Sequence, residues 1–253
     1  MRIDLYLVDN GYFKSREVAK LAIEEGLVKV DGKAITKPSF DYISGLIEVS
    51  EPLKFVSRGG HKLECAINSF YLDFKDKTIV DIGSSTGGFT DCALQYGAKK
   101  VYSIDVGIDQ IDPRLLNNIK VISMEETNFL DIEGFDEKVD YYVSDVSFIS
   151  IKKILYHLNE LDATDIVILI KPQFESKPSW LNKNGVLKDR SKHFEILKDI
   201  NEYVNSINYK IHKIVPSPIK GKSGNIEYLA YVKRNSNSNI DLYLTVKKAF
   251  GDD

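Results

Sequence analysis

The sequence predicts an α/β protein whose larger part is built on a mostly parallel sheet, preceded by a small α+β unit. Three observations lead to this fold class. From Lys77 onward, short apolar runs alternate with helix-like segments. A glycine-rich turn, DIGSSTGGFTD at residues 81–91, joins the first of these runs to a helix. The first 50 residues instead change from a helical to an alternating period near Asp31-Gly32, which is a hairpin signal.

The first unit is expected to contain two short helices followed by strands. Apolar residues precede an Asn10-Gly11 stop, and Ser15 is placed to cap a second helical segment that ends at Gly26. The alternation at Val28 and Val30 then predicts a strand, Asp31-Gly32 a hairpin turn, and Ile47 and Val49 another short strand.

The larger part is expected to carry seven strands with helices on both faces of the sheet. The predicted strands, in order, are TIVDIG, VYSIDVG, VISM, VDYYVSDVS, DIVILIKP, YKIHKIVPSP and NIEYLAYVKR. Helices are predicted in FTDCALQYG, in ISIKKILYHLNEL, from about residue 191 to 207 and in the tail at residues 242–250. Residues 173–188 read as an insertion.

Composition describes an ordinary globular protein, with 43% hydrophobic and 28% charged residues among 253. The longest apolar runs, such as residues 166–170, are far shorter than the roughly 20 residues that span a bilayer. The amino terminus lacks the apolar core of a secretory signal. We therefore expect a cytoplasmic protein, with Cys65 and Cys92 as reduced packing residues and no metal site.

The net charge of −3 does not by itself indicate a nucleic-acid binder. Residues 1–62 carry 10 basic and 9 acidic residues, and the remainder carries 24 and 28. If the protein binds RNA, its basic groups must be clustered in space.

The turn DIGSSTGGFTD predicts a cofactor site, because backbone amides and a helix amino terminus there can approach a nucleotide-like ligand. Ser85 occupies a position where a dinucleotide fingerprint requires glycine, and Asp81 suits a positively charged group. Asp105 follows 22 residues after Gly83, the usual distance for a carboxylate that binds a ribose diol. These features favour S-adenosylmethionine. A dinucleotide and a purely structural turn remain alternatives.

Charged residues stand at the ends of predicted strands, where ligands bind in open α/β sheets. Asp145 ends the fourth strand, Lys171 ends the fifth and Glu227 begins the last, while Lys62 lies on a helix just ahead of the first. A lysine in apolar surroundings near another cation can lose its proton near neutral pH, although a carboxylate opposes this. Each residue alone is weak as a signal, but together they predict a site.

The order Lys62, Asp145, Lys171, Glu227 resembles the Lys-Asp-Lys-Glu tetrad of FtsJ-like ribose 2'-O-methyltransferases. The motifs KFVSRGGHKL, DIGSSTGGFTDCAL, SDVSFIS, LIKPQFE and SPIKGKSGNIEYL are, in order, similar to those of the TlyA family of haemolysin-like ribosomal RNA methyltransferases. The resemblance covers about residues 1–233. It implies a Rossmann-like class I methyltransferase fold, S-adenosylmethionine as cofactor, ribosomal RNA or ribosomal subunits as partner, a cytidine ribose as substrate and the tetrad as the catalytic set. Cofactor-binding residues implied by the resemblance are Asp81, Gly83, Ser84, Ser85, Thr86, Gly87, Gly88, Phe89, Asp105, Val106, Asn128 and Asp145.

The amino-terminal unit resembles the RNA-binding domain of small-subunit ribosomal protein S-four. The resemblance implies RNA contacts by Arg2, Arg16, Lys20 and Arg58, and Arg16 and Lys20 share one helical face. We expect this domain at residues 1–53, a linker at 54–58 that couples RNA docking to the cofactor domain, and the methyltransferase domain at 59–253. The segment SKPSWLNKNG and the Asn-rich tail depart from the family pattern.

The favoured function is methyl transfer from S-adenosylmethionine to a ribose 2'-hydroxyl of ribosomal RNA. Two alternatives stay open. One is a haemolysin that acts directly on membranes, although no strong basic amphipathic helix is evident and no stable membrane association is expected. The other is an RNA-binding module whose sheet domain is inactive, which the complete tetrad disfavours.

Overall fold

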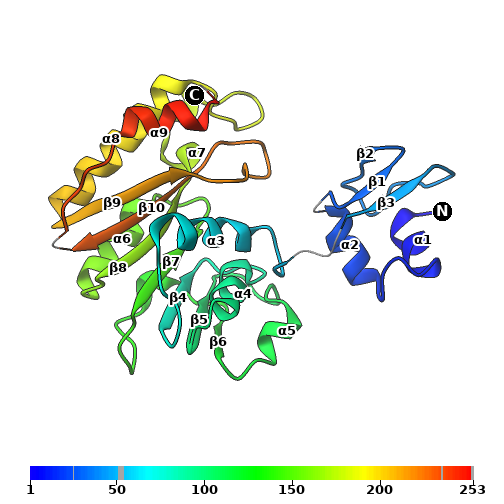
Figure 1. Cartoon of the computed structure of the whole chain (residues 1–253), viewed down its shortest axis with the longest axis horizontal. Coiled ribbons are helices and arrows are strands. Elements are labelled where there is room, and N and C mark those ends of the chain that lie inside the picture. The colour runs from blue at the N-terminus through cyan, green and yellow to red at the C-terminus, as the bar shows by residue number, and fades with distance from the viewer. Residues whose placement is uncertain (25, 51–53, 235, 252–253) are drawn as a thin grey trace. The chain divides into compact units, whose positions relative to one another are not determined.

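The computed structural model describes residues 1–24, 26–50, 54–234 and 236–251, and the chain divides into two compact units, 1–58 and 59–253 (Figure 1). The expected end of the first domain, at residue 53, lies outside the described residues. Among these residues, no helix combines the length and the apolar composition that crossing a bilayer requires.

The first unit packs two helices against a three-stranded antiparallel sheet. Its elements are α1 (Ile3–Asp9), α2 (Arg16–Glu24), β1 (Val28–Val30), β2 (Lys33–Ala34) and β3 (Ile47–Val49), with strand order β2-β1-β3. Apolar residues at helical spacing meet the inward side of β1 in a core of Ile3, Leu7, Ala19, Ala22, Ile23, Val28, Val30 and Tyr42. The hairpin turns at Asp31-Gly32, where both residues have positive φ, as predicted for that pair.

The second unit contains the seven-stranded sheet that the sequence predicts, in the order β6-β5-β4-β7-β8-β10-β9. Its strands are β4 (Thr78–Ile82), β5 (Lys100–Ile104), β6 (Val121–Met124), β7 (Tyr141–Ser144), β8 (Asp165–Ile170), β9 (Tyr209–Pro216) and β10 (Tyr228–Arg234). Pairing is parallel from β6 to β8, whereas β10 runs antiparallel to both β8 and β9. The mostly parallel α/β fold is thus confirmed.

Helices accompany the sheet in two groups. The first group has α3 (Gly59–Phe70), which packs against α4 (Gly88–Gln95) and against β9 and β10, and α5 (Pro113–Leu116). The second has α6 (Ile151–Glu160), α7 (Pro172–Glu175), α8 (Arg190–Ser206) and α9 (Leu242–Ala249), in which α8 contacts α6, α7 and α9. The segment expected as an insertion is partly regular, because it holds most of α7 and a 3₁₀ turn at Pro178–Trp180.

Strand direction determines which residues meet at the carboxyl edge of the parallel strands. β7 and β8 end there, so the residues that follow them, Asp145 and Lys171, lie at this edge. Because β10 is antiparallel, its beginning lies at the same edge, and Tyr228 pairs with Ile170. Glu227, directly before β10, is therefore placed beside Lys171. The apolar β8, fully buried from Ile166 to Ile170, holds this edge rigidly.

Candidate functional site

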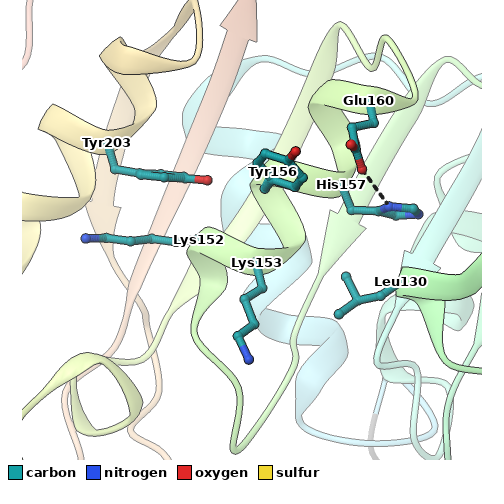
Figure 2. Close-up of a pocket in the computed structure, with 7 residues that line it drawn as sticks. All are labelled: Leu130, Lys152, Lys153, Tyr156, His157, Glu160 and Tyr203. Carbon is teal, nitrogen blue, oxygen red and sulfur yellow. Dashed lines mark ion pairs between the residues drawn. The ribbon is translucent and has the colours of Figure 1, made fainter.

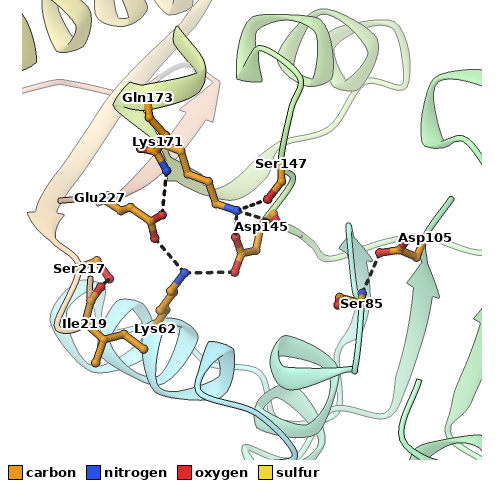
Figure 3. A network of polar contacts seen from close by, with 10 residues as sticks. All are labelled: Lys62, Ser85, Asp105, Asp145, Ser147, Lys171, Gln173, Ser217, Ile219 and Glu227. Carbon is orange, nitrogen blue, oxygen red and sulfur yellow. Dashed lines mark hydrogen bonds and ion pairs between the residues drawn. The ribbon is translucent and has the colours of Figure 1, made fainter. Parts of the chain in front are cut away.

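Four charged side chains from three strands and one helix form a connected network at the carboxyl edge (Figure 3). Lys62 Nζ, on α3, lies 2.8 Å from Glu227 Oε2 and 3.4 Å from Asp145 Oδ2. Lys171 Nζ forms an ion pair with Asp145 Oδ1 at a distance of 2.6 Å. The structure therefore brings together all four residues that the sequence singled out.

Burial makes this network electrostatically strong. Lys62, Lys171 and Glu227 are each at most 9% exposed. Burial by itself would lower the pKa of Lys62, but Asp145 and Glu227 outweigh it and raise that pKa above its ordinary value. Lys62 is therefore a fixed cation rather than a lysine with a lowered pKa. Charges buried at this density require their partners, and removal of one leaves another uncompensated.

Two neutral side chains complete the network and were not singled out from the sequence. Lys171 Nζ donates to Ser147 Oγ at 2.8 Å and to the Asp145 carbonyl at 3.3 Å. Gln173 Nε2 donates to Glu227 Oε1 at 3.2 Å. Ser147 and Gln173 lie in the motifs SDVSFIS and LIKPQFE, each two residues after a charged member of the network. That closeness in the chain is the sequence feature that could have identified them.

A glycine holds the loop between β9 and β10 close against the network. A Cβ built on Gly221 would lie 2.6 Å from Glu227 Oε1. Any larger residue at this position would push the Glu227 carboxylate away from Lys62 and Gln173.

The glycine-rich loop joins β4 to α4 and is fixed by Asp105. Gly83 and Gly87 have φ of 81° and 91°, and Ser85 adopts the same left-handed region at 49°. Ser85 N donates to Asp105 Oδ2 and Gly107 N donates to Asp105 Oδ1, both at 2.8 Å. The carboxylate at the end of β5 is thus oriented by backbone amides and keeps acceptor capacity for a diol.

Asp81 shows that the residues present fit a cationic ligand. Its side chain is fully buried, and Oδ2 accepts a hydrogen bond from Thr90 Oγ1 at 2.7 Å. No described residue hydrogen-bonds to its Oδ1. Burial raises the pKa of Asp81 to about 7, because the charged form lacks compensation. An ammonium group at this carboxylate would supply that compensation.

The remaining predicted cofactor residues divide by position. Gly88 and Phe89 are buried at the start of α4, and Ser84 is buried in the loop before it. In the same loop, Thr86 O accepts from Asp112 N. Val106 is 72% exposed beside Asp105. Asn128 caps a short turn through Leu130 N, and its neighbour Thr127 N donates to Asp105 O at 2.9 Å, so the loop after β6 lies against the loop after β5.

In the first unit, two of the three predicted RNA-binding arginines converge on one buried carboxylate. Arg2 donates twice to Asp4 at 3.0 Å, and Arg16 Nε donates to Asp4 Oδ2 at 2.9 Å. Burial would raise the Asp4 pKa, but the two arginines hold it at about 2. Arg2 and Arg16 side chains stay 45% and 40% exposed, and Lys20 and Arg58 are half-buried. Arg2 and Arg16 are thus held by Asp4 while part of each side chain stays exposed.

An exposed aromatic residue also lies beside the network and was missed by the sequence reasoning. Phe148 is 90% exposed and has a φ of 63°, a conformation that a bulky residue rarely adopts. It directly follows Ser147, and its ring lies 4.9 Å from that of Phe174. Backbone conformation, which a sequence pattern does not reveal, is what exposes it.

A separate pocket of about 430 Å³ lies on the helices α6 and α8 (Figure 2). It is lined by Leu130, Lys152, Lys153, Tyr156, His157, Glu160 and Tyr203. None of these residues belongs to the charged network or the glycine-rich loop, and we assign no ligand to this pocket.

Comparison with protein families gives two matches. The model of the FtsJ-like methyltransferases matches residues 55–234, and the S4 domain model matches residues 1–42. The first match contains the glycine-rich loop and all four members of the charged network.

Relatives match over nearly the whole chain. Hemolysin A of Brachyspira hyodysenteriae is 42% identical, over 91% of this chain and 99% of its own length. The 16S/23S rRNA (cytidine-2'-O)-methyltransferase TlyA of Mycobacterium tuberculosis is 34% identical, over 92% of this chain and 89% of its own. A solved structure of a hemolysin candidate from Streptococcus thermophilus is 36% identical and has a TM-score of 0.78. This match covers 100% of the present chain and 96% of the chain in that structure.

Proposed function

Because the chain belongs to the FtsJ-like methyltransferase family, we propose that it transfers a methyl group from S-adenosylmethionine to a ribose 2'-hydroxyl of ribosomal RNA. The observation that carries this proposal is the buried Lys62–Asp145–Lys171–Glu227 network at the edge where open α/β sheets bind ligands. Two lysines and two carboxylates linked by ion pairs can orient a hydroxyl group and provide a group that accepts its proton.

Lys171 is the residue we assign to the reacting hydroxyl. Its ammonium position is set by three oxygens, those of Asp145 Oδ1, the Asp145 carbonyl and Ser147 Oγ. A group fixed in this way can orient the hydroxyl oxygen toward the methyl donor. In its neutral amine form it can accept the hydroxyl proton as the oxygen–carbon bond forms and the carbon–sulfur bond breaks. Asp145 orients Lys171, while Lys62 keeps Glu227 in place and adds positive charge.

S-adenosylmethionine, when bound, supplies a methyl group on a positively charged sulfur. We assign its ammonium group to Asp81, whose Oδ1 has no hydrogen-bond partner among the described residues. We assign its ribose hydroxyls to Asp105, which the amides of Ser85 and Gly107 hold. The twelve cofactor-binding residues expected from the sequence remain a proposal, and the geometry of Asp81 and Asp105 supports two of them most directly.

The relatives and the first unit support ribosomal RNA as the substrate. TlyA of Mycobacterium tuberculosis is named for methyl transfer to cytidine in 16S and 23S rRNA, and we propose a cytidine ribose here as well. The S4 domain match at residues 1–42 supports an RNA partner, with Arg2 and Arg16 on its surface. A cytoplasmic location is consistent with this substrate. Methyl transfer is favoured over direct action on membranes, since the relative named Hemolysin A matches across the same methyltransferase region.

The experiment is to replace the network lysines one at a time. Lys171→Ala and Lys62→Ala are expected to keep affinity for S-adenosylmethionine, measured by calorimetry, but to lower methyl transfer at least about 100-fold. Labelled methyl incorporation into ribosomal subunits from cells that lack the gene gives the rate.

Lys75→Ala is the matched control, because Lys75 is exposed and precedes β4 at the opposite edge of the sheet. Unchanged transfer in both network variants would overturn the assignment. Mapping of 2'-O-methyl groups on the product RNA then identifies the nucleotide, and a site other than cytidine would contradict only that part of the proposal.

A further inference from the structure

Two loops that flank the charged network contain lysines and no acidic residues. Residues 176–188 carry three lysines and residues 217–226 carry two, and neither segment contains aspartate or glutamate. All five side chains are exposed, in a protein whose net charge is −3. We call these five lysines the basic rim: Lys177, Lys183, Lys188, Lys220 and Lys222.

Both loops lie at the carboxyl edge that carries the network. The first follows β8 and α7, and the second connects β9 to β10 directly before Glu227. Gly221 in the second loop lies against the Glu227 carboxylate. Lys220 and Lys222 flank Gly221 in the chain, so they lie on the part of this loop that approaches Glu227.

A buried asparagine ties the two loops together. Asn225, 4% exposed, accepts from Leu187 N at 3.0 Å and donates to Gly185 O at 3.1 Å. Its own carbonyl accepts from Gly221 N at 2.9 Å. Because these contacts satisfy backbone groups of both loops, the two loops are joined at Asn225.

The charge on this surface is not neutralised within the described part of the chain. No ion pair there involves Lys183, Lys188, Lys220 or Lys222, and Lys177 lies over the Trp180 ring. Asp189, which follows Lys188 in the chain, caps α8, because its Oδ1 accepts from the backbone amides of Ser191 and Lys192. Exposed lysines without an acidic partner, carried on two joined loops, suit a polyanion.

We propose that the basic rim binds backbone phosphates of the RNA next to the ribose that is methylated. This inference rests on the proposed function and deepens it, because it assigns the substrate's backbone to residues outside the S4 domain. Lysine contacts of this kind give affinity and orientation without reading sequence. The rim meets the requirement that basic groups in an acidic chain be clustered in space.

The test compares two charge reversals of equal size at opposite edges of the sheet. Lys220→Glu/Lys222→Glu changes the rim, and Lys75→Glu/Lys99→Glu changes exposed lysines that precede β4 and β5. Affinity for ribosomal RNA from cells lacking the gene is measured at several salt concentrations. The rim variant is expected to lose at least about tenfold in affinity, and its slope of log K against log salt is expected to fall by roughly 1.4 for two contacts.

Affinity for S-adenosylmethionine serves as the folding control and is expected to stay unchanged in both variants. Wild-type RNA affinity and salt slope in the rim variant would overturn the inference, and so would an equal loss in the control variant. Loss of binding to vesicles that contain phosphatidylserine, with RNA affinity intact, would assign the rim to a membrane instead and overturn it too. Absence of methyl transfer by the wild-type protein would refute the proposed function, a separate outcome from any of these.

Discussion

If Asp81 binds the cofactor as we propose, the ionisation of this single residue links pH to cofactor binding. Its raised pKa of about 7 means that the carboxylate gains charge as pH rises through neutrality. An ammonium partner binds the charged form, so affinity for S-adenosylmethionine should rise from pH 6 to about 7.5. It should fall again above about 8, where an α-amino group loses its own proton. Calorimetry across this range measures both limbs.

Asp81→Asn is the matched variant for this pH dependence. It keeps the size of the side chain but removes the charge, so we expect weaker binding and no rise between pH 6 and 7.5. The fall above pH 8 belongs to the ligand and should persist. A rising limb that survives in Asp81→Asn would show that another group controls the affinity.

Residue types and order were sufficient to find the charged network, but not its supports. Asp145, Lys171 and Glu227 stand out because together they mark the ends of strands that share one edge in an open α/β sheet, and Lys62 lies just ahead of the first strand. Ser147 and Gln173 are ordinary polar residues, and only the distances to Lys171 and Glu227 identify them. The raised pKa of Lys62 likewise depends on two carboxylates that are 83 and 165 residues away in the chain.

At the scale of elements, periodicity predicted the strands because each is short, apolar and bounded by turn residues. Strand direction was not predictable in the same way, since nothing in NIEYLAYVKR indicates an antiparallel neighbour. That direction is what brings Glu227 to the edge beside Lys171. The turn at Pro178–Trp180 and the helix α7 were missed because each is too short for a helical period to show.

The loop between β9 and β10 offers a test in which packing alone changes the site. Gly221→Ala adds a methyl group 2.6 Å from Glu227 Oε1, and the φ of Gly221 does not lie in the left-handed region that disfavours alanine. The carboxylate is expected to shift, and the added methyl group should lower the free energy of unfolding by about 1–3 kcal/mol without preventing folding. Methyl transfer should fall at least about tenfold, because small misplacements at a reacting centre are costly.

Gly134→Ala is the control, since no atom lies within 4 Å of its added Cβ and its φ is also not left-handed. It should change neither stability nor transfer. Full activity of Gly221→Ala with intact folding would show that the position of Glu227 tolerates displacement, and it would weaken the role assigned to that residue.

At the scale of the whole molecule, the two units are separately built. Among the described residues, the buried core of the first runs from Ile3 to Tyr42, and the large core of the second spans Val80 to Val246. The glycine-rich loop and the charged network lie entirely in the second unit. The arginines held by Asp4 lie entirely in the first. Cofactor binding and part of RNA binding are therefore expected to be separable.

A fragment of residues 54–253, which begins just before the methyltransferase match at residue 55, tests this separation. It retains its own core, so it should fold and bind S-adenosylmethionine within about twofold of the full chain. RNA affinity should fall at least about tenfold, because the S4 domain is gone while the basic rim remains. Calorimetry and RNA binding at fixed salt measure the two quantities. The same fragment with Lys220→Glu/Lys222→Glu should lose most of the RNA affinity that is left. If the unaltered fragment binds RNA as tightly as the full chain, the first unit does not contribute to docking, and the RNA-contacting role of Arg2 and Arg16 must be abandoned.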